Sequence, residues 1–138
     1  MNECVCAITG HRPSRFKLKY SEDYALCKKI KANMLEVFRK LHDEKEVRRF
    51  YVSGALGVDM WAAEQIFRLK EQPGYEDCCE NYVKRNCYMV DQANYLVAVY
   101  DDVWNLRSGT MQCVRYARKN DVPVVLIHPD TANIAYPM

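Results

Sequence analysis

Three short glycine-containing segments follow apolar runs and precede helical patterns, and their residue types suit an anionic ligand. Glycine lets a ligand approach the backbone closely. The start of a helix offers free N–H groups and a partial positive charge, which suit phosphate. The second and third segments add serine and threonine hydroxyl donors, and Arg12 can pair with phosphate through two hydrogen bonds. The segments are Gly10-His11-Arg12, Ser53-Gly54-Ala55-Leu56-Gly57 and Ser108-Gly109-Thr110.

Two carboxylates stand beside these segments, and they could accept hydrogen bonds from ribose hydroxyls. Asp59 begins a helical pattern, and Asp101 follows an apolar run. Each feature alone also has a structural explanation: the glycines could only turn the chain, while Asp59 and Ser108 could stabilise the helices they begin. Together the three segments favour a nucleotide or a phosphorylated sugar. Neither a GxGxxG nor a GxxxxGK[ST] motif is present, which argues against ordinary dinucleotide dehydrogenases and P-loop enzymes.

The apolar pattern predicts strands and helices that alternate along the chain. We expect strands at 4–9, 50–52, 95–100 and 122–127, helices at 21–41, 60–69, 75–94 and 111–117, and an irregular tail from 128. This order predicts an α/β, Rossmann-like three-layer sandwich, with a mostly parallel sheet between two layers of helices. In such a sheet the three segments lie at the carboxyl ends of the strands, where ligands bind beside the topological switch point.

Length and charge narrow the functional classes. The 138 residues fit one domain, spanning 1–138, and the formal net charge of +2 is too small to argue for nucleic acid. No apolar run approaches the roughly 20 residues that a membrane helix needs, so no membrane partner is expected. The N-terminal MNECVCAITGHRP lacks the features of a signal peptide, which predicts a cytoplasmic protein.

The cysteines do not form a recognisable metal-binding pattern. There are seven of them, without a CxxC pair, and only Cys78, Cys79 and Cys87 cluster in the sequence. A zinc site would require paired spacings, and adjacent cysteines have poor ligand geometry. We therefore predict reduced, mostly buried thiols, and neither a metal centre nor a cofactor.

Four stretches together resemble the YpsA/YspA-like branch of the SLOG superfamily, which is named for Smf/DprA and the LOG (lonely-guy) proteins. They are ITGHRP (8–13), SGALGVDMWAAE (53–64), RNCYMVDQANYLVAVYD (85–101) and SGTMQCVRYARKNDVPVV (108–125). The resemblance implies a Rossmann-like fold and a pocket for a nucleotide-derived ligand. It implies ligand contacts at Gly10, Arg12, Ser53, Gly54, Gly57, Asp59, Arg85, Asn86, Asp101, Ser108, Gly109 and Thr110, and His11 is a further candidate within the first segment.

The chain departs from the YpsA-like pattern in its middle. That pattern usually has a further strand and helix before the RN-x-YMVD motif, whereas here residues 74–84 fill the gap. We therefore expect a shortened protein that lacks an edge strand. A second subunit could cover the exposed sheet edge, which favours a homodimer.

A second departure concerns catalysis. LOG enzymes resemble this chain around Arg85 and release a base from a nucleoside monophosphate through a PGG-x-GT-xx-E motif, in which the arginine and the glutamate are catalytic. Here Leu106-Arg107 replace the paired glycines, and Cys113 stands at the glutamate position. A cysteine cannot take that role at neutral pH without strong activation. Glu64, Asp59 and Arg85 remain as weak catalytic candidates.

These observations favour a cytoplasmic sensor or regulatory module that binds a nucleotide derivative. The first alternative is a LOG-like phosphoribohydrolase acting on nucleoside monophosphates. The second is DprA-like binding of single-stranded nucleic acid, because residues 12–20 combine four basic side chains with Phe16 and Tyr20. A solvated loop explains that basic segment more simply.

Overall fold

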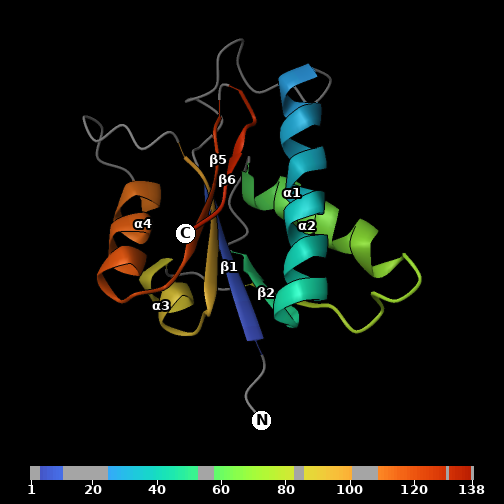
Figure 1. Ribbon diagram of the computed structural model, residues 1–138, viewed down its shortest axis with the longest axis horizontal. Helices are drawn as coiled ribbons and strands as arrows, with labels where there is room; N and C mark the ends of the chain where they lie inside the picture. The colour runs from blue at the N-terminus through green and yellow to red at the C-terminus, as the bar shows by residue number, and fades with distance from the viewer. Residues whose placement is uncertain are drawn as a thin grey trace.

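A computed structural model describes residues 4–10, 25–52, 58–82, 86–100, 109–129 and 131–137 of the chain. These residues form one six-stranded sheet with helices on both faces (Figure 1). The sheet and its helices confirm the predicted α/β, Rossmann-like architecture.

The sheet has the strand order β3-β2-β1-β4-β5-β6. The first five strands run parallel to their neighbours, and β6 runs antiparallel to β5. The chain moves outward from β1 to β3 and then crosses to β4 on the other side of β1. The topological switch point therefore lies between β1 and β4. The strands are Cys4–Gly10 (β1), Val47–Val52 (β2), Cys79–Tyr82 (β3), Tyr95–Val99 (β4), Val124–Ile127 (β5) and Ile134–Ala135 (β6).

Four helices in the described residues cover the sheet, and the sheet separates the core into two layers. They are α1 (Ala25–Lys45), α2 (Val58–Lys70), α3 (Asn86–Asp91) and α4 (Gly109–Lys119). Helices α1 and α2 pack on one face, where Phe38, Phe50 and Trp61 are fully buried, and α3 and α4 pack on the other (Figure 1). None of the helices in the described ranges combines the length and the apolar character that crossing a membrane requires.

The edge of the sheet beside β2 contradicts the sequence prediction. Residues 75–94 do not form one helix: Cys79–Tyr82 is a strand parallel to β2, and α3 covers only Asn86–Asp91. The expected absence of an edge strand was therefore wrong. This strand has four residues, CENY, and three of them are exposed. It therefore lacks the alternation of apolar and polar residues from which a strand is predicted. Because β3 covers β2, an uncovered β2 no longer argues for a homodimer.

Strand β2 also begins three residues earlier than predicted, within a polar stretch. Val47 is fully buried, while the two arginines after it find partners just before β3 and within it. Arg48 Nε lies 2.7 Å from an Asp77 carboxylate oxygen, and Arg49 donates to Asn81 Oδ1. Tertiary pairing therefore allows two charged residues in an inner strand.

The described part of the tail contains a strand, although the sequence predicted an irregular segment. Ile134 and Ala135 pair with β5, and the turn before them is closed by the His128 N–H, which donates to the Asn133 carbonyl at 2.9 Å. The Asn33 side chain of α1 donates to the Ala132 carbonyl at 2.6 Å. A strand of two residues has no periodicity to detect, so only these contacts reveal it.

Most of the described cysteines are buried, as predicted. Cys4, Cys6, Cys27, Cys78, Cys79 and Cys113 are all free thiols, and four of the six are buried. Burial is the main cause that raises the pKa of the Cys6 thiol far above its ordinary value. Such a thiol stays protonated and packs as a small apolar side chain.

Asn94 gives a first testable prediction about stability. Its side-chain oxygen accepts a hydrogen bond from the Val5 N–H at 2.9 Å, and its own N–H donates to the Val5 carbonyl at 2.7 Å. Asn94→Ala leaves the N–H of buried Val5 without this acceptor, so we expect the free energy of unfolding to fall by about 1–3 kcal/mol in urea denaturation. Asn94→Asp keeps an acceptor for this N–H, so its free energy of unfolding should fall clearly less. Equal losses in the two variants would contradict this role.

Candidate functional site

The carboxyl ends of the central strands lie level, as the predicted site requires. In the register of the sheet, Gly10 at the end of β1 stands beside Val99 of β4, and Val99 stands beside Ile127 of β5. Helix α4 follows β4 in the chain and begins at Gly109. The switch point thus lies between the ends of β1 and β4, near the beginning of α4.

The beginning of α2 is packed directly against the end of β1. A Cβ atom added to Gly10 would stand 2.4 Å from Val58 Cγ1 and 2.5 Å from Val58 Cβ, far closer than non-bonded carbon atoms approach. Val58 itself is 1% exposed. Gly10 is therefore required by the close approach of α2, which brings the beginning of that helix to this edge of the sheet.

The structure places only part of the residue set predicted from the sequence. Gly10, Gly109 and Thr110 come to the carboxyl edge, and the Thr110 side chain is buried in the first turn of α4. Asp59 and Asn86 lie in the first turns of α2 and α3, but their side chains fall outside the described part of the chain. The remaining candidates also lie outside the described residues: His11, Arg12, Ser53, Gly54, Gly57, Arg85, Asp101 and Ser108.

Two further residues reach this edge without having been predicted. Tyr100 follows β4, is 3% exposed, and donates its N–H to the Ile127 carbonyl at 3.1 Å. His128 follows β5 and is half-buried. The sequence signal was weak, because Tyr100 reads as the end of an apolar run and His128 as the start of an irregular tail. Their position next to β4 makes them candidates for shaping the edge.

The described residues that bear on catalysis are engaged in packing or ion pairs. Cys113, at the position of the LOG glutamate, is fully buried in the core between α4 and the sheet. Glu64 Oε2 lies 3.1 Å from Lys31 Nζ on α1, and Glu64 Oε1 lies 3.1 Å from Arg68 one turn further along α2. Glu64 therefore joins two helices, and Cys113 fills the core.

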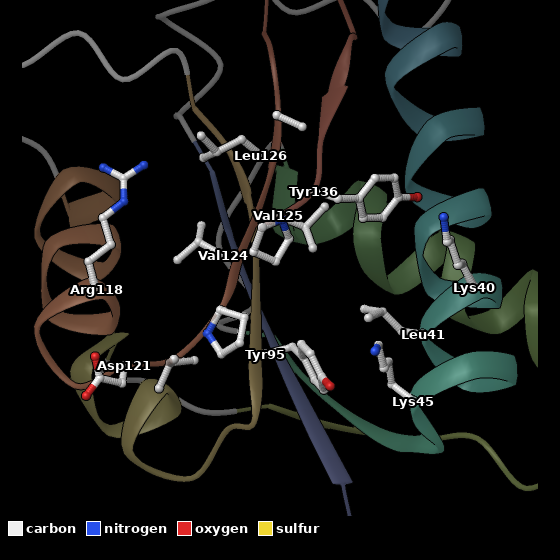
Figure 2. A pocket seen from close by; sticks show the side chains of 14 residues that line it. Lys40, Leu41, Lys45, Tyr95, Arg118, Asp121, Val124, Val125, Leu126 and Tyr136 are labelled. Carbon is white, nitrogen blue, oxygen red and sulfur yellow. The ribbon is translucent and has the colours of Figure 1, made fainter.

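A hollow of about 790 Å³ lies away from the carboxyl edge, beside β5 (Figure 2). Its floor is apolar and comes mainly from β5, while Lys40, Lys45 and Arg118 stand at its rim. The Lys40 ammonium group lies 4.3 Å from the centre of the Tyr136 ring, so this cation already has a partner. Most ligand pockets have a few polar groups that converge on one point. The described lining of this hollow has no such group of side chains.

The comparisons with known proteins agree on the family. The family model described as the YspA SLOG family matches residues 6–79, more than half of the chain. The uncharacterized SPbeta prophage-derived protein YoqJ of Bacillus subtilis (strain 168) is 33% identical over 99 residues, which are 70% of this chain. The match covers 46% of YoqJ, so the chain spans about half the length of the curated relative it matches.

A solved structure, the homoserine dehydrogenase of S. aureus, is also similar. It matches 93% of this chain and 26% of its own, at 12% identity and a TM-score of 0.39. That similarity is too weak to add to what the strand order already shows. The family model and the relative, in contrast, show the family: the chain belongs to the YspA SLOG family.

Proposed function

We propose that this chain binds a nucleotide or a nucleotide-derived ligand at the carboxyl ends of β1 and β4, as a sensor or regulatory module. Membership of the YspA SLOG family supports a nucleotide-related role in general. The single observation that carries the more specific proposal is the contact between Gly10 and Val58. It sets the beginning of a 13-residue helix against the end of the strand at the switch point.

The chemistry of this edge favours a phosphate group in the ligand. The N-terminus of a helix combines unsatisfied N–H donors with a partial positive charge, and phosphate accepts from several such donors at once. Helices α2 and α4 lie on opposite faces, but each follows a parallel strand, β2 or β4, and so begins near the carboxyl ends of the strands. Arg12 follows Gly10 by two residues in the sequence, and it is our candidate for a charged contact to the phosphate.

Binding without hydrolysis is the better supported activity. Cleavage of an N-glycosidic bond needs a carboxylate that stabilises the developing charge on the sugar or activates water. At the corresponding position the chain has Cys113, which is fully buried, and the carboxylate of Glu64 is held in two ion pairs. Neither side chain is placed to act as a general acid or base.

The proposal is tested by measuring the thermal midpoint of the purified chain against a panel of nucleotides. The panel comprises AMP, ADP, ATP, NAD, ADP-ribose and cyclic dinucleotides. A ligand present at about 100 times its dissociation constant should add roughly 2.7 kcal/mol of stability, which is easily measured. Each ligand that binds is then incubated with the protein and examined for released base, since its release would favour the hydrolase. A panel without any shift would contradict binding by the chain on its own.

Arg12→Ala tests where the ligand binds. A hydrogen bond to a charged group contributes about 1.5–3 kcal/mol, so its loss should weaken binding of the ligand found in the panel by about 10- to 100-fold. The thermal midpoint without ligand should hardly change. Arg115→Ala removes an exposed arginine of α4 and serves as the control, with unchanged affinity in isothermal titration. Equal affinity in both variants would place the ligand elsewhere.

A further inference from the structure

We propose that His42, Asp77 and Cys78 form a binding site for a divalent transition metal ion, for which Zn²⁺ is the best match. Each residue offers one ligand atom, and these three atoms lie within 4.8 Å of one another. His42 is in the last turn of α1, while Asp77 and Cys78 immediately precede β3. The site therefore lies at the amino ends of β2 and β3, opposite the edge proposed for the nucleotide.

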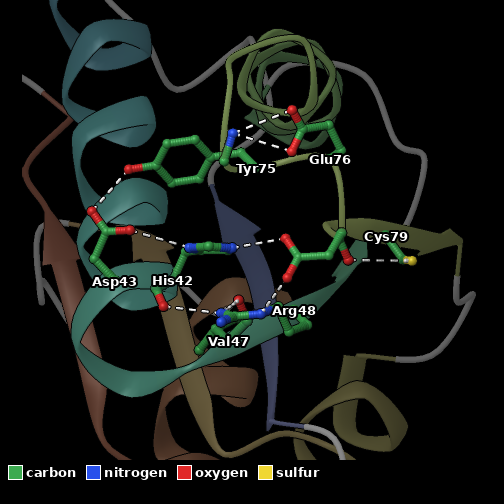
Figure 3. Close-up of polar contacts among 9 residues, drawn as sticks. His42, Asp43, Val47, Arg48, Tyr75, Glu76 and Cys79 are labelled. Carbon is green, nitrogen blue, oxygen red and sulfur yellow. Dashed lines mark hydrogen bonds and ion pairs between the residues drawn. The ribbon is translucent and has the colours of Figure 1, made fainter.

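The surroundings of His42 are those of a metal ligand. Its Nδ1 lies 3.2 Å from Asp43 Oδ1, and the other oxygen of Asp43 accepts a hydrogen bond from the Tyr75 hydroxyl at 2.8 Å (Figure 3). The His42 ring thus has a carboxylate at each nitrogen, Asp43 at Nδ1 and Asp77 at Nε2. In a metal site Nδ1 would donate its N–H to Asp43 while Nε2 binds the ion. Histidines that bind metals typically donate their second ring N–H to a carboxylate in this way, which fixes the orientation of the ring.

Asp77 is held in a matching orientation. Its Oδ1 lies 2.9 Å from His42 Nε2, and its Oδ2 is paired with Arg48 Nε at 2.7 Å. Arg48 is itself fixed by donating to the His42 carbonyl at 3.0 Å (Figure 3). One carboxylate oxygen is thus anchored from behind, while the other is turned toward the imidazole. A cation bound by both atoms would take the place of this contact, and the two atoms would move apart to about 3.5 Å.

Cys78 completes the donor set with a soft ligand. Its side chain is 1% exposed, and burial, followed by the charge of Asp77, raises the pKa of the thiol to about 11. A bound cation releases the thiol proton. The thiolate would then lie beside the Asp77 carboxylate, and a divalent ion would offset the repulsion between these two negative charges.

The donor types select the metal. Mg²⁺ and Ca²⁺ prefer oxygen ligands, whereas thiolate with imidazole suits Zn²⁺. Ligand bonds of about 2.0–2.3 Å place tetrahedral donors about 3.5 Å apart, so the most distant pair would close by about 1 Å. The fourth position would be taken by water, as in zinc sites that have three protein ligands.

The experiment is a titration of the chelator-treated, reduced protein with Co²⁺, a spectroscopic substitute for Zn²⁺. We expect one Co²⁺ per chain, a near-ultraviolet band from thiolate-to-cobalt charge transfer, and displacement of Co²⁺ by Zn²⁺. Cys78→Ser should abolish the band and weaken binding by more than about 100-fold, since loss of an outer partner alone costs about 10- to 100-fold. Asp43→Ala should keep the band and weaken binding within that smaller range.

Cys79→Ser is the matched control, because Cys79 is the exposed neighbour of Cys78. Its band and affinity should equal those of the original chain. Circular dichroism and the thermal midpoint of each variant without metal establish that it is folded, and Zn²⁺ should raise the midpoint of Cys79→Ser but not that of Cys78→Ser. The proposal is overturned if the original chain gives no charge-transfer band, or if Cys78→Ser retains the band with unchanged affinity.

Discussion

Gly10→Ala is expected to abolish nucleotide binding and to lower the free energy of unfolding by about 1–3 kcal/mol, the usual cost of overpacking a core. The added methyl group would overlap the Val58 side chain, whose three nearest atoms stand 2.4–2.6 Å away. Two of these are branch atoms of a β-branched side chain, and the third is its Cβ. A rotamer change cannot remove all three contacts, so the first turn of α2 has to move away from β1. Urea denaturation and isothermal titration with the ligand found in the panel measure the two effects.

Gly74→Ala is the matched control for this substitution. Gly74 has a φ of 94° and open space around its Cα, so alanine is strained there without meeting a neighbour. We expect a stability loss of about 1–2 kcal/mol from the backbone alone. Because Gly74 lies in the α2–β3 connection, nucleotide affinity should stay unchanged. If both variants lost affinity, instability would explain the effect; if Gly10→Ala bound normally, the contact with α2 would not position the ligand.

Trp61→Ala is expected to cause the largest loss of stability, about 3–5 kcal/mol, through lost apolar contacts and the cavity left behind. Trp61 is fully buried on α2 and is the largest such side chain among the described residues. It belongs to the core shared by α1, α2 and the sheet, and Lys31 Nζ of α1 lies 6.0 Å from its ring centre. Since small domains are stable by only about 5–15 kcal/mol, this single change should leave a barely stable fold.

Phe67→Ala on the same helix is the control for Trp61→Ala. Its side chain is 59% exposed, so its removal should change the free energy of unfolding by no more than about 0.5 kcal/mol. Trp61→Phe should fall between the two. Far-UV circular dichroism is the suitable probe, because Trp61→Ala leaves Trp104 as the remaining tryptophan. Similar losses at positions 61 and 67 would contradict the described packing of α2.

The sequence alone determined the class of fold and the segments that surround the proposed nucleotide site. Strand β4 is buried at nearly every position, and α1 buries its apolar residues at helical spacing, so both patterns reflect contact with the core. Gly10 could be singled out because it follows an apolar run, where a glycine lets a ligand approach the backbone closely. The reason for it, the packing of Val58, depends on a residue 48 positions later and came only from the structure.

Only the tertiary structure decided the edges of the sheet. Strands β3 and β6 have four and two residues, and three of the four residues of β3 are exposed. Their order comes from pairing with an inner strand, together with contacts such as those of Arg49 with Asn81 and of Asn33 with Ala132. Local periodicity cannot register an interaction whose partner lies far away in the chain.

The proposed metal site shows most clearly the difference between what the sequence determines and what the tertiary structure decides. The cysteines have no paired spacing and two of them are adjacent, so the sequence predicted that no metal would bind. His42 stands 35 residues before Asp77, and the end of α1 reaches the segment before β3 only because β2 and β3 are neighbours in the sheet. The amino-acid sequence specifies which donors exist. Their convergence is a property of the parallel sheet, which sets chemically unrelated segments side by side at each of its ends.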